Sequence, residues 1–102
     1  MISKETIRED LKNIRYYYAR REVFENSEAE IGGMSFLPII RKYNQAIREA
    51  SPRLYDLYVS LYLLNHTQRE LADKMGLTPE HVQVLHRGLI QYFLKYFHNF
   101  GS

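Results

Sequence analysis

A short stretch in the second half of the chain constrains the fold most. Thr67 and Glu70 have the spacing of a capping box, in which each side chain accepts a hydrogen bond from the other residue's backbone N–H, so a helix should begin here. Gly76 tolerates a positive φ and should end that helix. Thr78 and Pro79 are a typical cap and first residue of a second helix. The pattern therefore predicts two helices joined by a short turn, which is the layout of a helix-turn-helix.

The second of these helices has two different sides. Apolar residues recur at helical spacing and predict a buried side made of Val82, Leu85, Leu89 and Phe93. The opposite side is polar except for one valine and consists of Glu80, Gln83, Val84, Arg87 and Gln91. In the first helix Leu71, Ala72 and Met75 form a short apolar face, and the small Ala72 lets the second helix approach its backbone closely. We expect the first helix to pack against the rest of the protein, and the second helix to present its polar side to a partner.

These residues also resemble a known family. Asn65–Ala72 is similar to the Gly-Leu-Thr-x-x-Glu-Ile-Ala signature of region four of bacterial sigma factors, and Leu54–Val59 resembles the first helix of that domain. Gly76–Val84 is similar to the LuxR-type recognition helix. The ArpU and RinA types of phage-encoded sigma-like regulators share this layout, with a helical N-terminal half before the sigma-like half. The resemblance covers Leu54–Ile90 and does not extend to residues 1–50.

The resemblance implies a DNA-binding transcriptional regulator. In the resembling families, the positions that face the bases correspond here to Glu80, His81, Gln83, Val84 and Arg87. Arg87 can bind guanine bidentately, and Gln83 can bind adenine. Glu80 can accept from cytosine, and Val84 can touch the methyl group of thymine. The alternative interpretation of the same residues is an ordinary solvated helix face.

Further residues are candidate contacts to DNA phosphates, namely Thr67, Gln68, Arg69, Thr78 and Gln91. The first three lie at the start of a helix, where N–H groups and the helix dipole favour a phosphate. The same residues would cap that helix in any case, so a purely structural role stays open for them.

The charge balance limits how tightly such a domain can bind double-stranded DNA. The net charge is +2, and residues 52–102 carry five Lys/Arg against four Asp/Glu. Affinity for a duplex comes largely from neutralised phosphates, so a lone domain should bind weakly. A homodimer would double the contacts, or RNA polymerase could hold the domain at a promoter. The alternative is a protein-interaction module that binds a sigma factor or polymerase subunit with little DNA affinity.

Helices are expected along the whole chain, which predicts an all-α fold of about five helices. The first helix should run from a cap at Ser3 to about Phe24, with a seam of Ile7, Leu11, Ile14 and Tyr18. Later helices are expected from about Ser35 to Ala50, from Pro52 to near Leu64, and, after the first helix of the pair, from Pro79 to about His98. Ser51 and Pro52 are a cap and first residue of the third of these helices. Tyr58–Leu64 is rich in β-formers, but its position between Ser51-Pro52 and the capping box favours helix. The expected organisation is an N-terminal helix (1–26), a linker (27–34) and a helical domain (35–102) with the helix-turn-helix at 67–98, together one compact domain.

The N-terminal helix mixes basic and aromatic residues. Lys12, Arg15, Arg20 and Arg21 are interleaved with Tyr16, Tyr17 and Tyr18. Such a mixture can bind nucleic acid, but it is also typical of an amphipathic helix with tyrosines at the edge of the core. The seam of this helix could join two chains or cover the helices of its own chain.

Enzymatic and metal-binding functions are not expected. The chain has no Cys, which excludes disulfides and thiolate metal sites. His81 and His86 are five residues apart and do not share a helix face as a zinc pair would. Gly32-Gly33 is not followed by the Lys-Ser/Thr of a phosphate loop. No catalytic residue, cofactor or metal is therefore predicted. No apolar run is long enough to cross a bilayer, Met1–Glu5 has no signal-peptide pattern, and a cytoplasmic protein is expected.

Overall fold

The computed structural model describes residues 2–21 and 36–100, and every regular element in these ranges is helical. The elements are α1 (Lys4–Ala19), α4 (Leu37–Ile47), α5 (Pro52–Tyr58), the π-helical turn η1 (Val59–Leu63), α6 (Gln68–Met75) and α7 (Pro79–Phe100). The all-α prediction is confirmed for this part of the chain. The predicted linker, residues 27–34, lies outside the described residues.

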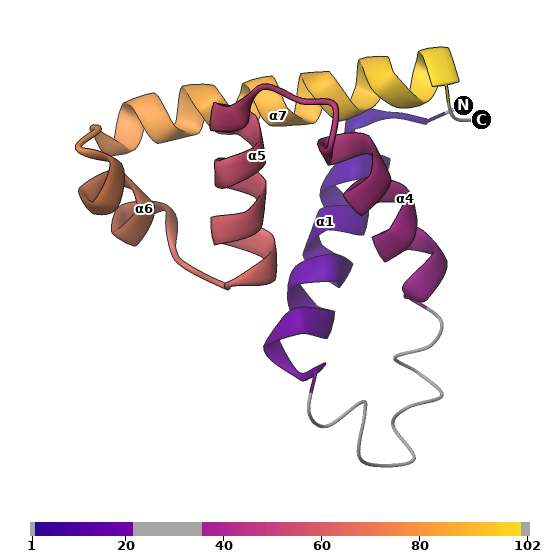
Figure 1. Ribbon diagram of the computed structural model, residues 1–102, viewed down its shortest axis with the longest axis horizontal. Helices are drawn as coiled ribbons and strands as arrows, with labels where there is room; N and C mark the ends of the chain where they lie inside the picture. The colour runs from indigo at the N-terminus through magenta and orange to yellow at the C-terminus, as the bar shows by residue number, and fades with distance from the viewer. Residues whose placement is uncertain (1, 22–35, 101–102) are drawn as a thin grey trace.

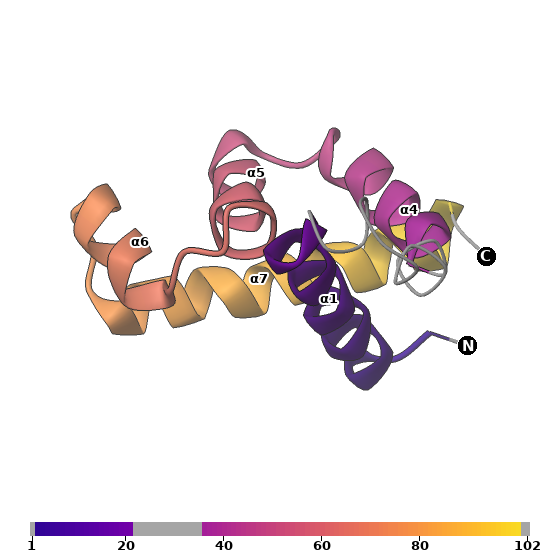
Figure 2. The same cartoon turned by 90° about the horizontal axis from the view of Figure 1, so that it is seen from below.

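The long helix α7 organises the molecule. It has 22 residues and runs along one side of a body that measures 41 × 32 × 22 Å. Figure 1 shows α6, α5, α1 and α4 following one another along the same side of α7, with α6 at its N-terminal end. Seen from below, α1 lies across α7, with α5 to one side of α1 and α4 to the other (Figure 2). One face of α7 is therefore covered by other helices along its length.

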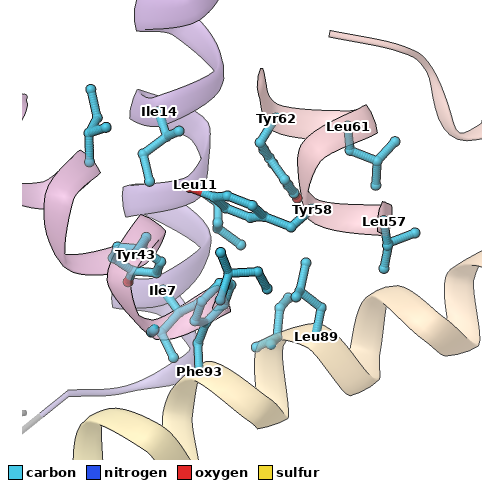
Figure 3. Packing of buried hydrophobic residues seen from close by; sticks show 14 of the residues in the cluster. Ile7, Leu11, Ile14, Tyr43, Leu57, Tyr58, Leu61, Tyr62, Leu89 and Phe93 are labelled. Atoms are coloured by element: carbon cyan, nitrogen blue, oxygen red, sulfur yellow. The ribbon is translucent and has the colours of Figure 1, made fainter. Parts of the chain in front are cut away.

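The core joins α1 to the rest of the chain. Ile7, Leu11 and Ile14 of α1 are fully buried or nearly so, and they point toward Tyr58 and Phe93 of α5 and α7 (Figure 3). The rings of Tyr58 and Phe93 meet edge to face, with 5.7 Å between their centroids. The seam predicted for the first helix thus covers helices of its own chain. Tyr18, the last residue of that predicted seam, is only half-buried.

Tyrosine hydroxyl groups connect α1, α4 and α5 through hydrogen bonds at the edge of the core. Tyr43 donates to Asp10 Oδ2 at 2.7 Å, and Tyr58 donates to Asn44 Oδ1 at 2.7 Å. Asn44 in turn donates to the hydroxyl of Tyr18 at 3.4 Å. Burial, above all, raises the pKa of Tyr43 and of Tyr58, so both phenols stay protonated and act as donors.

Two more tyrosines attach α7 to α4 and to the turn that follows it. The hydroxyl of Tyr92 donates to the backbone oxygen of Ala46 at 2.6 Å, and that of Tyr96 donates to Glu49 Oε2 at 2.8 Å. Both bonds lie in the C-terminal half of α7. This half is therefore fixed to the body of the molecule, and the N-terminal half extends toward α6.

The first helix is shorter than predicted. Its N-terminus is capped by Ser3 as expected, but the helix ends at Ala19, whereas the sequence suggested about Phe24. The N–H of Arg20 bonds to the carbonyl oxygens of Tyr16 and Tyr17, and Arg20 leaves the helical region with a φ of −121°. Consecutive aromatic residues have lower helix propensity than the straight-chain residues before them, which explains an early end.

Helix α4 is also shorter than expected, because the run predicted from about Ser35 to Ala50 is helical only over Leu37–Ile47. After it, the N–H groups of residues 48–50 bond to carbonyl oxygens three positions back, which forms a tight final turn. Ser51 then adopts an extended conformation, as a residue before proline should, and caps α5 through the N–H of Leu54.

The predicted helix from Pro52 to near Leu64 changes its winding on the way. It is α-helical through Tyr58 and π-helical over Val59–Leu63. Three successive side chains of the widened turn are buried, namely Ser60, Leu61 and Tyr62. The segment ends at Asn65, which has a positive φ of 61°, a conformation that asparagine tolerates better than most residues.

Candidate nucleic-acid interface

Helix α6 begins with the predicted capping box. The N–H of Glu70 donates to Thr67 Oγ1 at 3.0 Å, and the N–H of Thr67 donates to Glu70 Oε1 at 2.8 Å. These hydrogen bonds, first of all the one from the Thr67 backbone, lower the pKa of Glu70. Arg69 is exposed beside them, and Gln68 is half-buried. The structural role of Thr67 is thus clear, whereas its contact with a phosphate stays a prediction.

The turn between α6 and α7 depends on a glycine, as predicted. Gly76 has a φ of 67°, in the left-handed region. The N–H of Leu77 donates to the carbonyl oxygen of Ala72 at 2.9 Å, and that of Gly76 donates to Asp73 at 3.3 Å. This is the Schellman arrangement that ends many helices. It fixes the direction in which the chain leaves α6 and so the angle at which α7 begins.

Thr78 begins the next helix in the predicted way. The N–H of His81 donates to Thr78 Oγ1 at 3.1 Å, and the N–H of Val82 donates to the carbonyl oxygen of Thr78 at the same distance. Pro79 occupies the first helical position, where its missing N–H has no intrahelical partner to lose. The helix then continues to Phe100, slightly beyond the expected end near His98.

The outer side of the first turns of α7 is open to solvent. The predicted base-reading residues are all exposed, namely Glu80, His81, Gln83, Val84 and Arg87, and so is Gln91. Val84 is 52% exposed, which is unusual for a valine. Below them Val82 and Leu89 are fully buried and Leu85 is half-buried. The helix is therefore anchored along one side and free along the other.

The exposed residues do not all share one line along the helix. Glu80, Gln83, Arg87 and Gln91 follow spacings of three and four residues and form a single polar stripe. His81 lies two residues from Gln83, a rotation of about 200° around the helix, and therefore belongs to the other edge of the exposed surface. A flat partner that faces the stripe would meet Gln83 and Arg87 before it met His81.

Comparisons with protein-family models, curated proteins and solved structures gave no match. Any functional assignment therefore depends on the residues and the geometry of this chain.

His86 lies next to the polar stripe, on the side of α7 that packs against the rest of the protein, and it was not among the predicted site residues. His86 is half-buried on α7 and shares a hydrogen bond with the hydroxyl of Tyr62 in η1. Burial, and after it the nearby charge of Arg8, lowers the pKa of His86, while burial raises the pKa of Tyr62 to about 12. Both side chains are therefore uncharged at neutral pH. The signal in the sequence was the position of His86, four residues after the buried Val82.

Some of the basic residues in and after α1 lie over tyrosine rings, and others do not. The guanidinium of Arg20 lies 4.3 Å from the ring centroid of Tyr16, and that of Arg21 lies 6.0 Å from that of Tyr18. These two arginines follow α1 directly and cover tyrosines of that helix, as the amphipathic interpretation expects. Lys12 is exposed and Arg15 is half-buried.

Residues 2–21 and 36–100 also bear on a metal site and on a membrane span. No group of three His, Asp or Glu side chains there could hold a metal ion. No helix there is both long and apolar enough to span a membrane.

Proposed function

We propose that this protein is a DNA-binding transcriptional regulator of the sigma-like helix-turn-helix type. The observation that carries the proposal is the polar stripe of Glu80, Gln83, Arg87 and Gln91, presented on a helix whose other side is buried. An α-helix fits the major groove of B-DNA, and arginine and glutamine are suited to purine edges. In this proposal the first turns of α7 enter the groove, and α6 lies across the DNA backbone.

The low charge of residues 52–102 favours assisted binding. The domain then acts as a homodimer or together with RNA polymerase, and the resemblance to phage regulators favours a phage-related role. Selection of bound duplexes from a random pool, with and without RNA polymerase, distinguishes the two. A palindromic site recovered by the protein alone indicates a homodimer, whereas a site recovered only with polymerase indicates joint binding.

Arg87→Ala tests whether α7 reads bases. We expect the variant to lose about 1–3 kcal/mol of binding free energy on the selected site and clearly less on random duplex, because a base contact carries sequence information. Arg41→Ala removes an equal charge from the exposed side of α4 and serves as the control. Equal losses on both duplexes would show that Arg87 touches only phosphate, and no loss on either would exclude it from the interface.

A protein partner is the second candidate function, and one surface feature favours it. A cavity of about 340 Å³ lies between η1 and α6, where Val59, Leu64, Leu71 and Met75 provide an apolar lining with Asp56 and Lys74 at its side. Leu64 is 57% exposed there. A salt titration separates the two functions. If binding to random duplex has a log–log slope near zero, groove binding through phosphates is wrong and the protein-interaction function is favoured.

A further inference from the structure

Three basic residues of α1 form a stripe of their own. Arg8, Lys12 and Arg15 are spaced by four and three residues, so they share one side of the helix. Arg8 and Lys12 are exposed, and Arg15 is half-buried. Within the described part of the chain, none of the three forms an ion pair with a carboxylate. We call this set the α1 basic stripe.

Of the three acidic residues of α1, one lies away from the α1 basic stripe and two lie beside it. Asp10 accepts a hydrogen bond from Tyr43 on the side that faces α4. Glu9 is rotated by about 100° from Arg8, but it is three residues before Lys12 and lies at the edge of the stripe. Glu5, three residues before Arg8, also lies beside the stripe. The positive charges of the stripe thus outnumber the carboxylates beside them.

The packing of α1 against α7 and η1 brings residues of the basic stripe close to these two elements. The charge of Arg8 acts on His86, which is the neighbour of Arg87 in α7. The charge of Arg15 acts on Tyr62 of η1 and on Glu70 at the start of α6. Figure 2 shows α1 lying across α7 on the side nearer the viewer. The basic stripe therefore extends from the middle of α7 toward the beginning of α6.

We propose that the α1 basic stripe binds phosphates of duplex DNA beside the groove that α7 enters. Packed helices lie about 8–10 Å apart, and the major groove is about 12 Å wide, so cations on a helix next to α7 meet the flanking backbone rather than the bases. The stripe also supplies positive charge that α7 lacks, because Arg87 is accompanied by Glu80 on its own stripe. This inference rests on the proposed DNA-binding function and identifies a contact element outside the region of resemblance.

The test is a salt titration with two matched triple variants. The first carries Arg8→Gln, Lys12→Gln and Arg15→Gln, which remove charge but keep polar side chains. The second carries Arg41→Gln, Arg48→Gln and Arg53→Gln, which remove the same charge from exposed positions on α4, just after it and at the start of α5. Binding of each full-length chain to a short random-sequence duplex is measured by fluorescence anisotropy over a range of salt concentrations. Circular dichroism checks that both variants keep the native helix content.

We expect the log–log salt slope of the α1 variant to be smaller in magnitude than that of the native chain by about 2.7, since each phosphate contact contributes about 0.9. The control variant should keep the native slope. On a selected site the α1 variant should lose the same factor of affinity as on random duplex, because phosphate contacts carry no sequence information.

Failures of the two proposals give different results. A native chain with a slope near zero would overturn DNA binding as such. A steep native slope that both variants share would overturn only the role of the α1 basic stripe. If the α1 variant binds duplex normally but loses binding to RNA polymerase, the stripe contacts a protein and the inference is wrong. If the α1 variant loses helix content, the single variant Lys12→Gln, at an exposed position, replaces it, with an expected slope change of about 0.9.

Discussion

Gly76 and Gly88 are exposed glycines with different backbone requirements. Gly76 has a φ of 67°, whereas Gly88 lies within α7, and a Cβ atom would meet nothing within 4 Å at either position. We therefore expect Gly76→Ala to destabilise the protein by about 1 kcal/mol, because the left-handed region is strained for an L-residue. Gly88→Ala should stabilise it by about 0.5–1 kcal/mol through helix propensity. Urea unfolding followed by circular dichroism measures both, and a neutral Gly76→Ala would contradict the turn between α6 and α7.

His86 should make stability depend on pH. Its pKa in the folded chain is lowered from 6.5, so the unfolded chain takes up a proton at a higher pH than the folded chain does. The contribution of neutral His86 is therefore fully present above pH 6.5 and is lost as the pH falls below that value. In His86→Gln this loss should disappear, while glutamine still offers Tyr62 a polar partner.

The pH effect is measured by urea unfolding of the native chain and of His86→Gln at one pH above 6.5 and at one below it. The native chain should lose more stability between the two conditions than the variant does. His98→Gln, at an exposed position near the end of α7, serves as the control and should behave like the native chain. If His86→Gln shows the same pH dependence as the native chain, His86 titrates as it does in the unfolded state.

At the scale of elements, the sequence predicts those features that depend on residues close together in the chain. The caps at Ser3, Ser51, Thr67 and Thr78 and the glycine at Gly76 act over three or four residues, and each is found where the pattern indicated it. The exposed stripe of α7 follows from the same kind of local information, because helical periodicity alone separates it from the buried side.

The element features that escaped prediction depend on packing. The widened turn η1 buries Ser60, Leu61 and Tyr62 together, and no local sequence pattern predicts such a turn. The hydrogen bond between Tyr62 and His86 joins residues 24 positions apart. The residues that pack beside the candidate interface could not be predicted either. Sequence periodicity shows which face of a helix is buried, but not which other helix lies against that face.

At the scale of the whole molecule, the place of α1 is the main feature that the sequence left open. Its apolar seam was equally compatible with a second chain and with the core of its own chain. Contacts between residues far apart in sequence show that α1 packs on its own chain. One of them is the hydrogen bond from Tyr43 to Asp10, 33 positions away. Because Ile7, Leu11 and Ile14 belong to the same buried cluster as Phe93, we expect α1 to unfold together with the rest of the chain.

Leu11→Ala tests this cooperativity. Leu11 is 1% exposed, and truncation of such a leucine typically costs about 2–5 kcal/mol, a large part of the stability of a small domain. The variant should unfold in one transition at lower urea, with the same midpoint by circular dichroism and by tyrosine fluorescence, since most tyrosines lie outside α1. Lys12→Ala, one residue away and exposed, should change stability by less than about 0.5 kcal/mol. If Leu11→Ala instead loses part of its helical signal in a separate early transition, α1 is an appended arm, and its basic stripe would have no fixed position beside α7.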